Sequence, residues 1–537
     1  MIKIKTVRDL PFGIIDTLES QSIPRGACSK SLNFQSRGDR IALRPGYKLY
    51  GNEVEGTGKI TGHYTAKIGS TEIQYRTHGK KLEYYVSATD TWTEIGSDIL
   101  GEDADGKDMS FAEYHPVAGD YLYINSPYGP FLKIDLADPG TATDVYVAYA
   151  GDTSVAHNHY GYIRIKQNRM FLWGRTGDPF GVYLSQINNP ALSLDIEDFS
   201  FSATRVVGEG AIFRQDDGGP IMSIESYGDA EYCIHEKKTW LLTTTADDTD
   251  ATNVIYRDRV GIPYWKACVS TADGIYYIDD IDKSDPQIRL LTIPYGMDRV
   301  MPTSISKGRR WKNTDVGIDL SDYTFDKAIG KEYGDLILFA CRTSDSSQNN
   351  RMIVFNKRQK TFDLVNYWAS TLEIFDGKLM GGDPVSGNIQ QFYTDYDDNG
   401  SNIENYWEGN KDDLDWAGKK KLKKLIIKGR IAASQELTVS VKLDNDADFV
   451  EMGTISGADA DASTDVVLIG RGIVGRTEIG GEGSDNDANS FVSEINVASL
   501  LDKFNYITIR FEAEELGACE VSEWSYYDFR IKSHSQN

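Results

Sequence analysis

A polar turn followed by an apolar strand recurs about seven times between residues 79 and 380, and this repeat constrains the fold more than any other feature. Each unit opens with Gly or Asn and continues with a short run rich in Tyr, Ile, Leu and Phe. Such runs are too short for a helical solenoid and are typical of β-strands. The openings lie 40 to 60 residues apart, which is the period of a four-stranded propeller blade. They are Gly79, Gly119, Asn168, Gly228, Gly274, Gly334 and Gly377.

The sixth unit shows the predicted blade most clearly. Its strands are expected at residues 323–329, 336–340, 352–356 and 361–365, with a polar hairpin tip at 356–360. The second strand is a dense apolar run, as expected for a strand buried on both faces. We therefore expect one propeller over residues 56–405, with seven blades counted from the marks and six or eight as alternatives. The glycine-marked strands should lie in the inner half of each blade.

A propeller must join its first and last blades or leave an open edge. The last unit is short of strands, so the segment around residues 41–50 is expected to supply one to the last blade near residues 388–393. The glycine-marked units stop near residue 410, and about six strands without a convincing helix follow. The prediction is thus an all-β chain: an N-terminal extended segment (1–55), a β-propeller (56–408) and a jelly-roll-like β-sandwich (409–537).

Composition limits the possible partners and the compartment. The chain has 537 residues and a formal net charge of −24, from 57 basic and 81 acidic residues. This charge opposes DNA wrapping and binding to anionic membranes; it suits solubility, or an acidic wall along which DNA slides. No apolar run is long enough to span a bilayer and the N-terminus lacks a signal peptide, so synthesis in the cytoplasm is expected. The five cysteines are dispersed, which indicates buried hydrophobic residues and not disulfides or zinc.

Catalytic and metal motifs are weak, and no catalytic, cofactor or metal residue is predicted. No nucleophile elbow, zinc-protease or phosphate-loop spacing occurs, and His157 and His159 lack a third zinc ligand nearby. Asp395, Asp397 and Asn399 match the first half of a calcium loop, but Tyr406 occupies the place of the bidentate Glu. Whether these three residues bind calcium or form a tight acidic turn stays open. The chain is not expected to be an enzyme.

The N-terminal segment carries a recognisable sequence motif ahead of the propeller. Ser31-Leu32-Asn33-Phe34 is followed by Arg44-Pro45-Gly46-Tyr47, and two more segments, 397–407 and 469–476, follow in order. This order resembles propeller-containing virion proteins of tailed bacteriophages, of the tail-nozzle, tail-tubular or stabilization type. The resemblance implies no catalysis. It implies a structural protein of the virion tail or neck that acts in DNA ejection.

The same resemblance implies partners. These are other tail or neck proteins and further copies of the chain, in a homo-oligomeric ring, first of all a hexamer, around a channel through which DNA passes without specific binding. Two alternatives remain. One is a receptor- or carbohydrate-binding protein of the tail tip, for which Tyr276-Tyr277 or Tyr526-Tyr527 could stack on sugars. The other is a propeller glycosidase using carboxylates at the axis.

Overall fold

The structure is a computed structural model. It describes residues 2–8, 12–19, 22–24, 26–52, 58–145, 161–166, 168–175, 177–188, 195–199, 209–214, 216–228, 230–243, 252–258, 260–292, 301–307, 309–311, 314–415, 418–459, 488–497 and 503–531. Within these residues no helix is long and apolar enough to cross a membrane.

Seven four-stranded antiparallel sheets follow one another along the described chain, and each is one blade. Blade 1 has β6 (Ile60–Ile68), β7 (Thr71–His78), β8 (Lys81–Val86) and β9 (Thr91–Glu94). Blade 2 has β10 (Ser110–Tyr114), β11 (Tyr121–Asn125), β12 (Leu132–Asp135) and β13 (Ala142–Asp144). Blade 3 has β14 (Tyr162–Lys166), β15 (Arg169–Arg175), β16 (Asp178–Leu184) and β17 (Ala211–Arg214). Blade 4 has β18 (Ile221–Tyr227), β19 (Ala230–His235), β20 (Lys238–Thr243) and β21 (Thr252–Asp258).

The remaining three blades complete the series. Blade 5 has β22 (Cys268–Thr271), β23 (Gly274–Asp279), β24 (Gln287–Thr292) and β25 (Met301–Ser304). A small hairpin of β26 (Arg309–Trp311) and β27 (Thr314–Val316) follows it. Blade 6 has β28 (Tyr323–Tyr333), β29 (Leu336–Thr343), β30 (Arg351–Asn356) and β31 (Thr361–Val365). Blade 7 has β32 (Thr371–Phe375), β33 (Lys378–Gly382), β34 (Ile389–Phe392) and, from the N-terminus, β5 (Tyr47–Tyr50).

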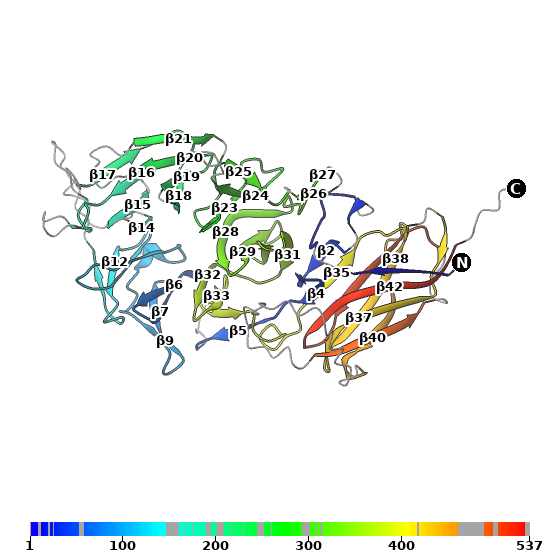
Figure 1. The fold of residues 1–537 in the computed structure, drawn as a ribbon. Coiled ribbons are helices and arrows are strands. Elements are labelled where there is room, and N and C mark those ends of the chain that lie inside the picture. The colour runs from blue at the N-terminus through cyan, green and yellow to red at the C-terminus, as the bar shows by residue number, and fades with distance from the viewer. Residues whose placement is uncertain are drawn as a thin grey trace.

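The blades form a closed ring. The first strand of each blade contacts the blade that follows it in the chain, and β32 of blade 7 contacts β6 of blade 1. Figure 1 shows the blades as the left-hand body of the molecule, with the sandwich to the right. The predicted fold class, an all-β chain with a propeller and a β-sandwich, is confirmed, and the blade number is seven.

The last blade closes as the sequence predicts. β5 pairs antiparallel with β34, with Tyr50 opposite Ile389 and Tyr47 opposite Phe392. The other half of the proposed segment does not take part, because Ile41 lies in β4 (Arg40–Leu43) and pairs with Val521 of the sandwich. The turn at Pro45 and Gly46 separates the two strands, so that one short segment serves both bodies.

In six of the seven units the Gly or Asn that opens the unit stands at the start of the second strand of a blade. This strand lies in the inner half of the blade, as predicted. The apolar character of these strands reflects burial on both faces: every residue of β23 is buried. The exception is Gly79, which precedes β8, the third strand of blade 1. The second strand there is β7, which follows a tight turn at Gly69 (φ +60°).

The sandwich draws on both ends of the chain. One sheet runs β3 (Phe34–Arg37), β4, β42 (Cys519–Ile531), β37 (Lys424–Ala432) and β40 (Ala488–Asn496), with β1 (Ile2–Val7) and β36 (Lys420–Lys421) also on β42. The other runs β2 (Cys28–Leu32), β35 (Tyr406–Gly409), β41 (Ile507–Ala513), β38 (Glu436–Leu443) and β39 (Val450–Ser456). Two single-turn 3₁₀ helices, η2 (Glu102–Ala104) and η4 (Gly457–Asp459), complete the described elements that we name.

Residues 1–55 are therefore not a separate extended segment. β1 to β4 are sandwich strands, and the sandwich already begins at Tyr406 within the span assigned to the propeller. Each of these strands is short and depends on its pairing: β1 and β4 lie on the 13-residue β42, β3 pairs with β4, and β2 pairs with β35. Between the two sheets, Trp407, Phe511 and Trp524 form an aromatic triad with ring centroids 5.3 to 5.7 Å apart.

Candidate functional site

A cavity of about 440 Å³ lies on the axis of the propeller. It is lined by residues of the first strand of all seven blades, together with the loop that precedes β22. Because side chains alternate along a strand, each first strand contributes only one or two side chains to the axis. The size is that of a small-molecule pocket.

A belt of charged side chains surrounds one part of this cavity. Arg164 of β14 lies 3.1 Å from the carboxylate of Glu225 on β18 and donates at 2.5 Å to the carbonyl of Ile224. Lys331 of β28 forms an ion pair of 2.7 Å with Glu373 of β32. These four charges neutralise one another in pairs, because each carboxylate lies next to a cation on a neighbouring blade.

A second part of the cavity is lined by side chains that lack such partners. His63 of β6 is only 6% exposed, and neither of its ring nitrogens has a hydrogen-bond partner. Burial lowers the pKa of His63 to about 3, and the positive charges of Lys331, Arg76 and Lys266 lower it further. His63 is therefore a neutral imidazole at physiological pH.

Lys266 and Trp265 precede β22 on the opposite arc of the ring. Burial lowers the pKa of Lys266 to about 8, and its ammonium has no ion pair with any described residue. It lies 4.5 Å from the ring centroid of Trp265. The indole nitrogen of Trp265 is buried without a hydrogen-bond partner.

More unpartnered polar groups lie behind His63, where blade 1 packs against blade 7. They are the hydroxyl of Thr65, both amide atoms of Gln74 and one guanidinium nitrogen (Nη1) of Arg76. Thr371 of β32 adds an unpartnered hydroxyl from the blade 7 side and also lines the cavity. We call His63, Thr65, Gln74, Arg76 and Thr371 the blade 1–7 wall. Buried polar groups normally have partners, so this concentration requires an explanation.

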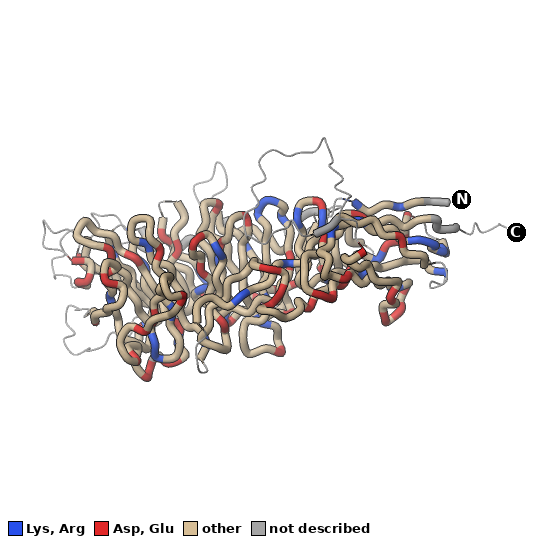
Figure 2. The backbone as a smooth tube through the Cα atoms, turned by 90° about the horizontal axis from the view of Figure 1, so that it is seen from below, with Lys and Arg blue, Asp and Glu red and all other residues tan. Residues whose placement is uncertain are grey.

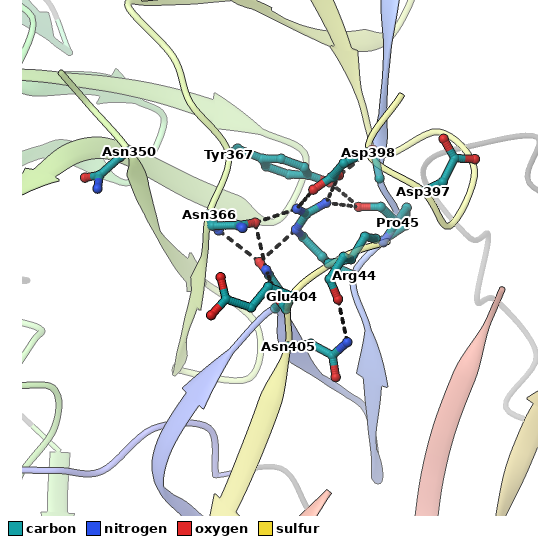
Figure 3. A network of polar contacts seen from close by, with 12 residues as sticks. Arg44, Pro45, Asn350, Asn366, Tyr367, Asp397, Asp398, Glu404 and Asn405 are labelled. Carbon is teal, nitrogen blue, oxygen red and sulfur yellow. Dashed lines mark hydrogen bonds and ion pairs between the residues drawn. The ribbon is translucent and has the colours of Figure 1, made fainter. Parts of the chain in front are cut away.

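A contrasting polar cluster joins the propeller to the sandwich (Figure 3). The side chain of Arg44 is fully buried, and all five of its guanidinium hydrogens have acceptors. Nε donates to Asn33, Nη1 donates to the carbonyl of Pro45, and Nη2 donates to Asn366. Nη1 and Nη2 also donate to the two carboxylate oxygens of Asp398 at 2.8 and 2.7 Å, as a bidentate pair. The guanidinium also lies 4.2 Å from the ring centroid of Tyr367. We call this cluster the Arg44 junction.

Asn33 completes the Arg44 junction from the turn between β2 and β3. Its backbone is in the left-handed region (φ +62°), which Asn tolerates better than most residues. Its amide group donates to Asn366 at 2.7 Å and to the carbonyl of Glu404 at 2.6 Å. The junction thus ties the N-terminus, the end of blade 6 and the link from blade 7 to β35 at one point.

The three residues whose calcium binding the sequence leaves open lie in an acidic turn in this region. Asp395 forms an ion pair with Lys48, and the backbone carbonyls of Asp395 and Asp397 accept from Gly46 and Tyr47. Asp397 also accepts from the backbone N–H of Gly400, and Asn399 has φ +51°. Among the described residues, no group of three or more His, Cys, Asp and Glu is arranged to hold a metal ion. Calcium binding by Asp395, Asp397 and Asn399 stays untested.

The other candidates from the sequence have three different outcomes. The five cysteines are buried, as predicted. Tyr276, Tyr277 and Tyr526 are at most 2% exposed, so they are core residues and are not available to stack on a sugar. His157, His159 and the segment 469–476 lie outside the described residues.

Sequence reasoning missed His63, Trp265 and Lys266. Each is a single residue in an ordinary strand or turn, and about 200 residues separate the first from the other two. For His63 the signal in the sequence is a polar side chain in the first strand of a blade, where alternation directs it toward the axis; Trp265 and Lys266 precede β22 and carry no such signal.

Comparison with known proteins gives little beyond the fold. The chain matches no described protein family and no curated protein. Among solved structures it is similar to the computationally designed Ika8 protein, with 8% identity, a TM-score of 0.35 and coverage of 65% of this chain and 100% of that one. Two structures of the extracellular domain of BT4673 from B. thetaiotaomicron, described as one-component and hybrid two-component systems, match at 9% identity with TM-scores of 0.41 and 0.43. They cover 82% of this chain, which spans 60% of theirs.

Proposed function

We propose that this chain is a structural component of a bacteriophage tail or neck and that it assembles into a homo-oligomeric ring around the DNA channel. The observation that carries the proposal is the Arg44 junction. Two of the three segments that carry the phage resemblance, the N-terminal phrase with Arg44 and the stretch that contains Asp398, meet there in one bidentate ion pair. The resembling residues of these two segments thus share a single role, which is to fix the propeller against the sandwich.

A fixed two-body subunit suits a ring. Figure 2 shows the propeller and the sandwich end to end along an elongated molecule, with acidic residues spread over both. A rigid β scaffold presents its loops to partners, and a closed ring requires the same heterologous interface to repeat around one axis. The axial cavity of about 440 Å³ is of small-molecule size, so DNA would pass between subunits and not through a propeller. A net charge of −24 would keep DNA from sticking as it passes.

Electron microscopy of the purified protein and of the parent virion tests this proposal. Closed rings, first of all hexamers, and density for the chain around the tail or neck channel are the expected results. A monomeric bead in solution together with a peripheral position in the virion would contradict the proposal.

A glycan-binding or glycan-cleaving role at the tail tip is the second candidate. It is favoured by Arg164, Glu225, Glu373 and Tyr64 at the propeller axis, the residue types that propeller glycosidases use. Incubation of the purified chain with host surface polysaccharide, read by release of reducing ends, tests it. Release that Glu225→Gln and Glu373→Gln abolish would establish the second candidate and reject the passive ring.

A further inference from the structure

We propose that the axial cavity of the propeller binds a small organic anion, a carboxylate or a phosphate monoester, through Lys266, Trp265 and His63. This binding is a property of the single subunit and goes beyond the structural role proposed above. The other charged side chains of this cavity that we describe, Arg164, Glu225, Lys331 and Glu373, already form ion pairs with one another.

The unpartnered groups at this site are chiefly donors. The ammonium of Lys266 and the indole N–H of Trp265 can only donate, and neutral His63 donates from one ring nitrogen. Thr371, whose hydroxyl is also unpartnered, can donate from the edge of the site. A ligand that satisfies such a set must be rich in acceptors, and carboxylate and phosphate oxygens are acceptors without hydrogens of their own.

The electrostatics favour an anion over a neutral acceptor. Lys331 is neutralised by Glu373, whereas Lys266 has no ion pair in the described structure, and the carboxylate of Asp108 acts on it only from beyond ion-pair distance. Arg76, 1% exposed, lies behind His63, and among the described residues its carboxylate partner is Glu83, which it shares with His78. An anion beside Lys266 would therefore offset a positive charge that burial makes costly.

Water alone does not account for the site. Ordered water could satisfy the amide of Gln74 and the hydroxyl of Thr65, because each of these groups both donates and accepts hydrogen bonds. Both groups lie deep in the blade 1–7 wall. Water would leave Lys266 without an ion pair. The volume of about 440 Å³ holds a molecule with several carboxylates and is at the lower end of the range of ligand pockets.

Calorimetric titration of the purified full chain tests the proposal, with citrate and inorganic phosphate as the probes. We expect saturable binding of at least one probe, at one site per chain, and the tighter probe tells carboxylate from phosphate ligands. Lys266→Met should weaken this binding by about tenfold or more, because it removes a charge-assisted hydrogen bond. Lys378→Met is the matched control, since Lys378 is an exposed lysine at the start of β33, and it should bind as the wild type does.

A second measurement does not depend on any variant folding. A crystal or cryo-EM structure of the wild-type protein in citrate should show the anion against Lys266 and Trp265. Absence of saturable binding for both probes up to about 10 mM, well above a millimolar Kd, would overturn the proposal. Equal weakening by Lys266→Met and Lys378→Met would also overturn it, because it would indicate unspecific charge screening.

Discussion

The Arg44 junction and the blade 1–7 wall both lie beside blade 7, and both are buried and polar, but their hydrogen bonds are filled in opposite ways. Every guanidinium hydrogen of Arg44 has an acceptor, whereas the side chains of His63 and Gln74 make no hydrogen bond within the described structure. A saturated cluster leaves nothing for a ligand and stabilises one arrangement of the two bodies. An unsaturated cluster next to a cavity costs stability in isolation and is suited to binding. The same physics thus suits the first cluster to architecture and the second to the binding proposed above.

The largest effect is expected from deleting residues 1–50. The deletion removes β5, the closing strand of blade 7, and also β1 to β4 of the sandwich together with Arg44 itself. Exposed edges would remain on both bodies, so the melting temperature should fall sharply and cooperative unfolding should be lost. Deletion of residues 1–8 removes only β1 and is the control with a small effect. Thermal melting followed by circular dichroism measures both, and an unchanged curve for the long deletion would contradict strand closure.

Arg44→Met tests the saturated cluster directly. It leaves Asp398 and the amide groups of Asn33 and Asn366 without their common donor, and loss of one partner of a buried ion pair costs about 3–5 kcal/mol in the free energy of unfolding. Arg40→Met is the control: Arg40 pairs with Glu520 at 2.6 Å, but its side chain is 31% exposed. That pair should contribute less than about 1 kcal/mol. Chemical denaturation of both variants measures the difference, and equal losses would refute a special role for the junction.

Asp363 gives the interface of the two bodies a pH dependence. It is buried on β31, accepts from the backbone N–H and hydroxyl of Ser36 at 3.1 and 3.2 Å, and burial raises its pKa from 3.8 to about 7. Because the folded state holds this proton more tightly, its contribution to stability is largest below pH 4 and declines as pH rises to 7, then stays constant. Asp363→Asn removes that decline. The variant should gain stability over the wild type between pH 4 and 7, by at most about 4 kcal/mol.

Unfolding free energies measured across pH 4 to 8 would show this gain. Asp335→Asn, at an exposed turn of the same blade, is the control and should show no comparable trend. A constant offset between Asp363→Asn and the wild type at all pH values would contradict a proton held at Asp363.

The sequence predicts the repeating part of the fold well and the joining part poorly. Second strands such as β23 and β29 have apolar, buried central residues because both faces are covered there, so their number and spacing can be read directly. Gly79 points to the third strand of blade 1 and not to the second, because Gly69 and Gly79 both form tight turns with positive φ. Strands of four or five residues such as β2 and β4 carry too little pattern to indicate which sheet they join. His63 and Lys266 line the same cavity only because the propeller ring closes, and no local sequence pattern encodes that closure.

The smallest effect is expected in the unsaturated cluster. Gln74 is fully buried, and neither amide atom has a partner, so Gln74→Met removes two unsatisfied polar groups and keeps a side chain of similar length. In contrast to Arg44→Met, this change should be neutral or stabilise the protein by about 1 kcal/mol, since no hydrogen bond is lost and the cost of desolvating the amide disappears. Chemical denaturation of the ligand-free protein measures it. A loss of several kcal/mol would show that Gln74 is held in a filled network, and the contrast between the two clusters would then fail.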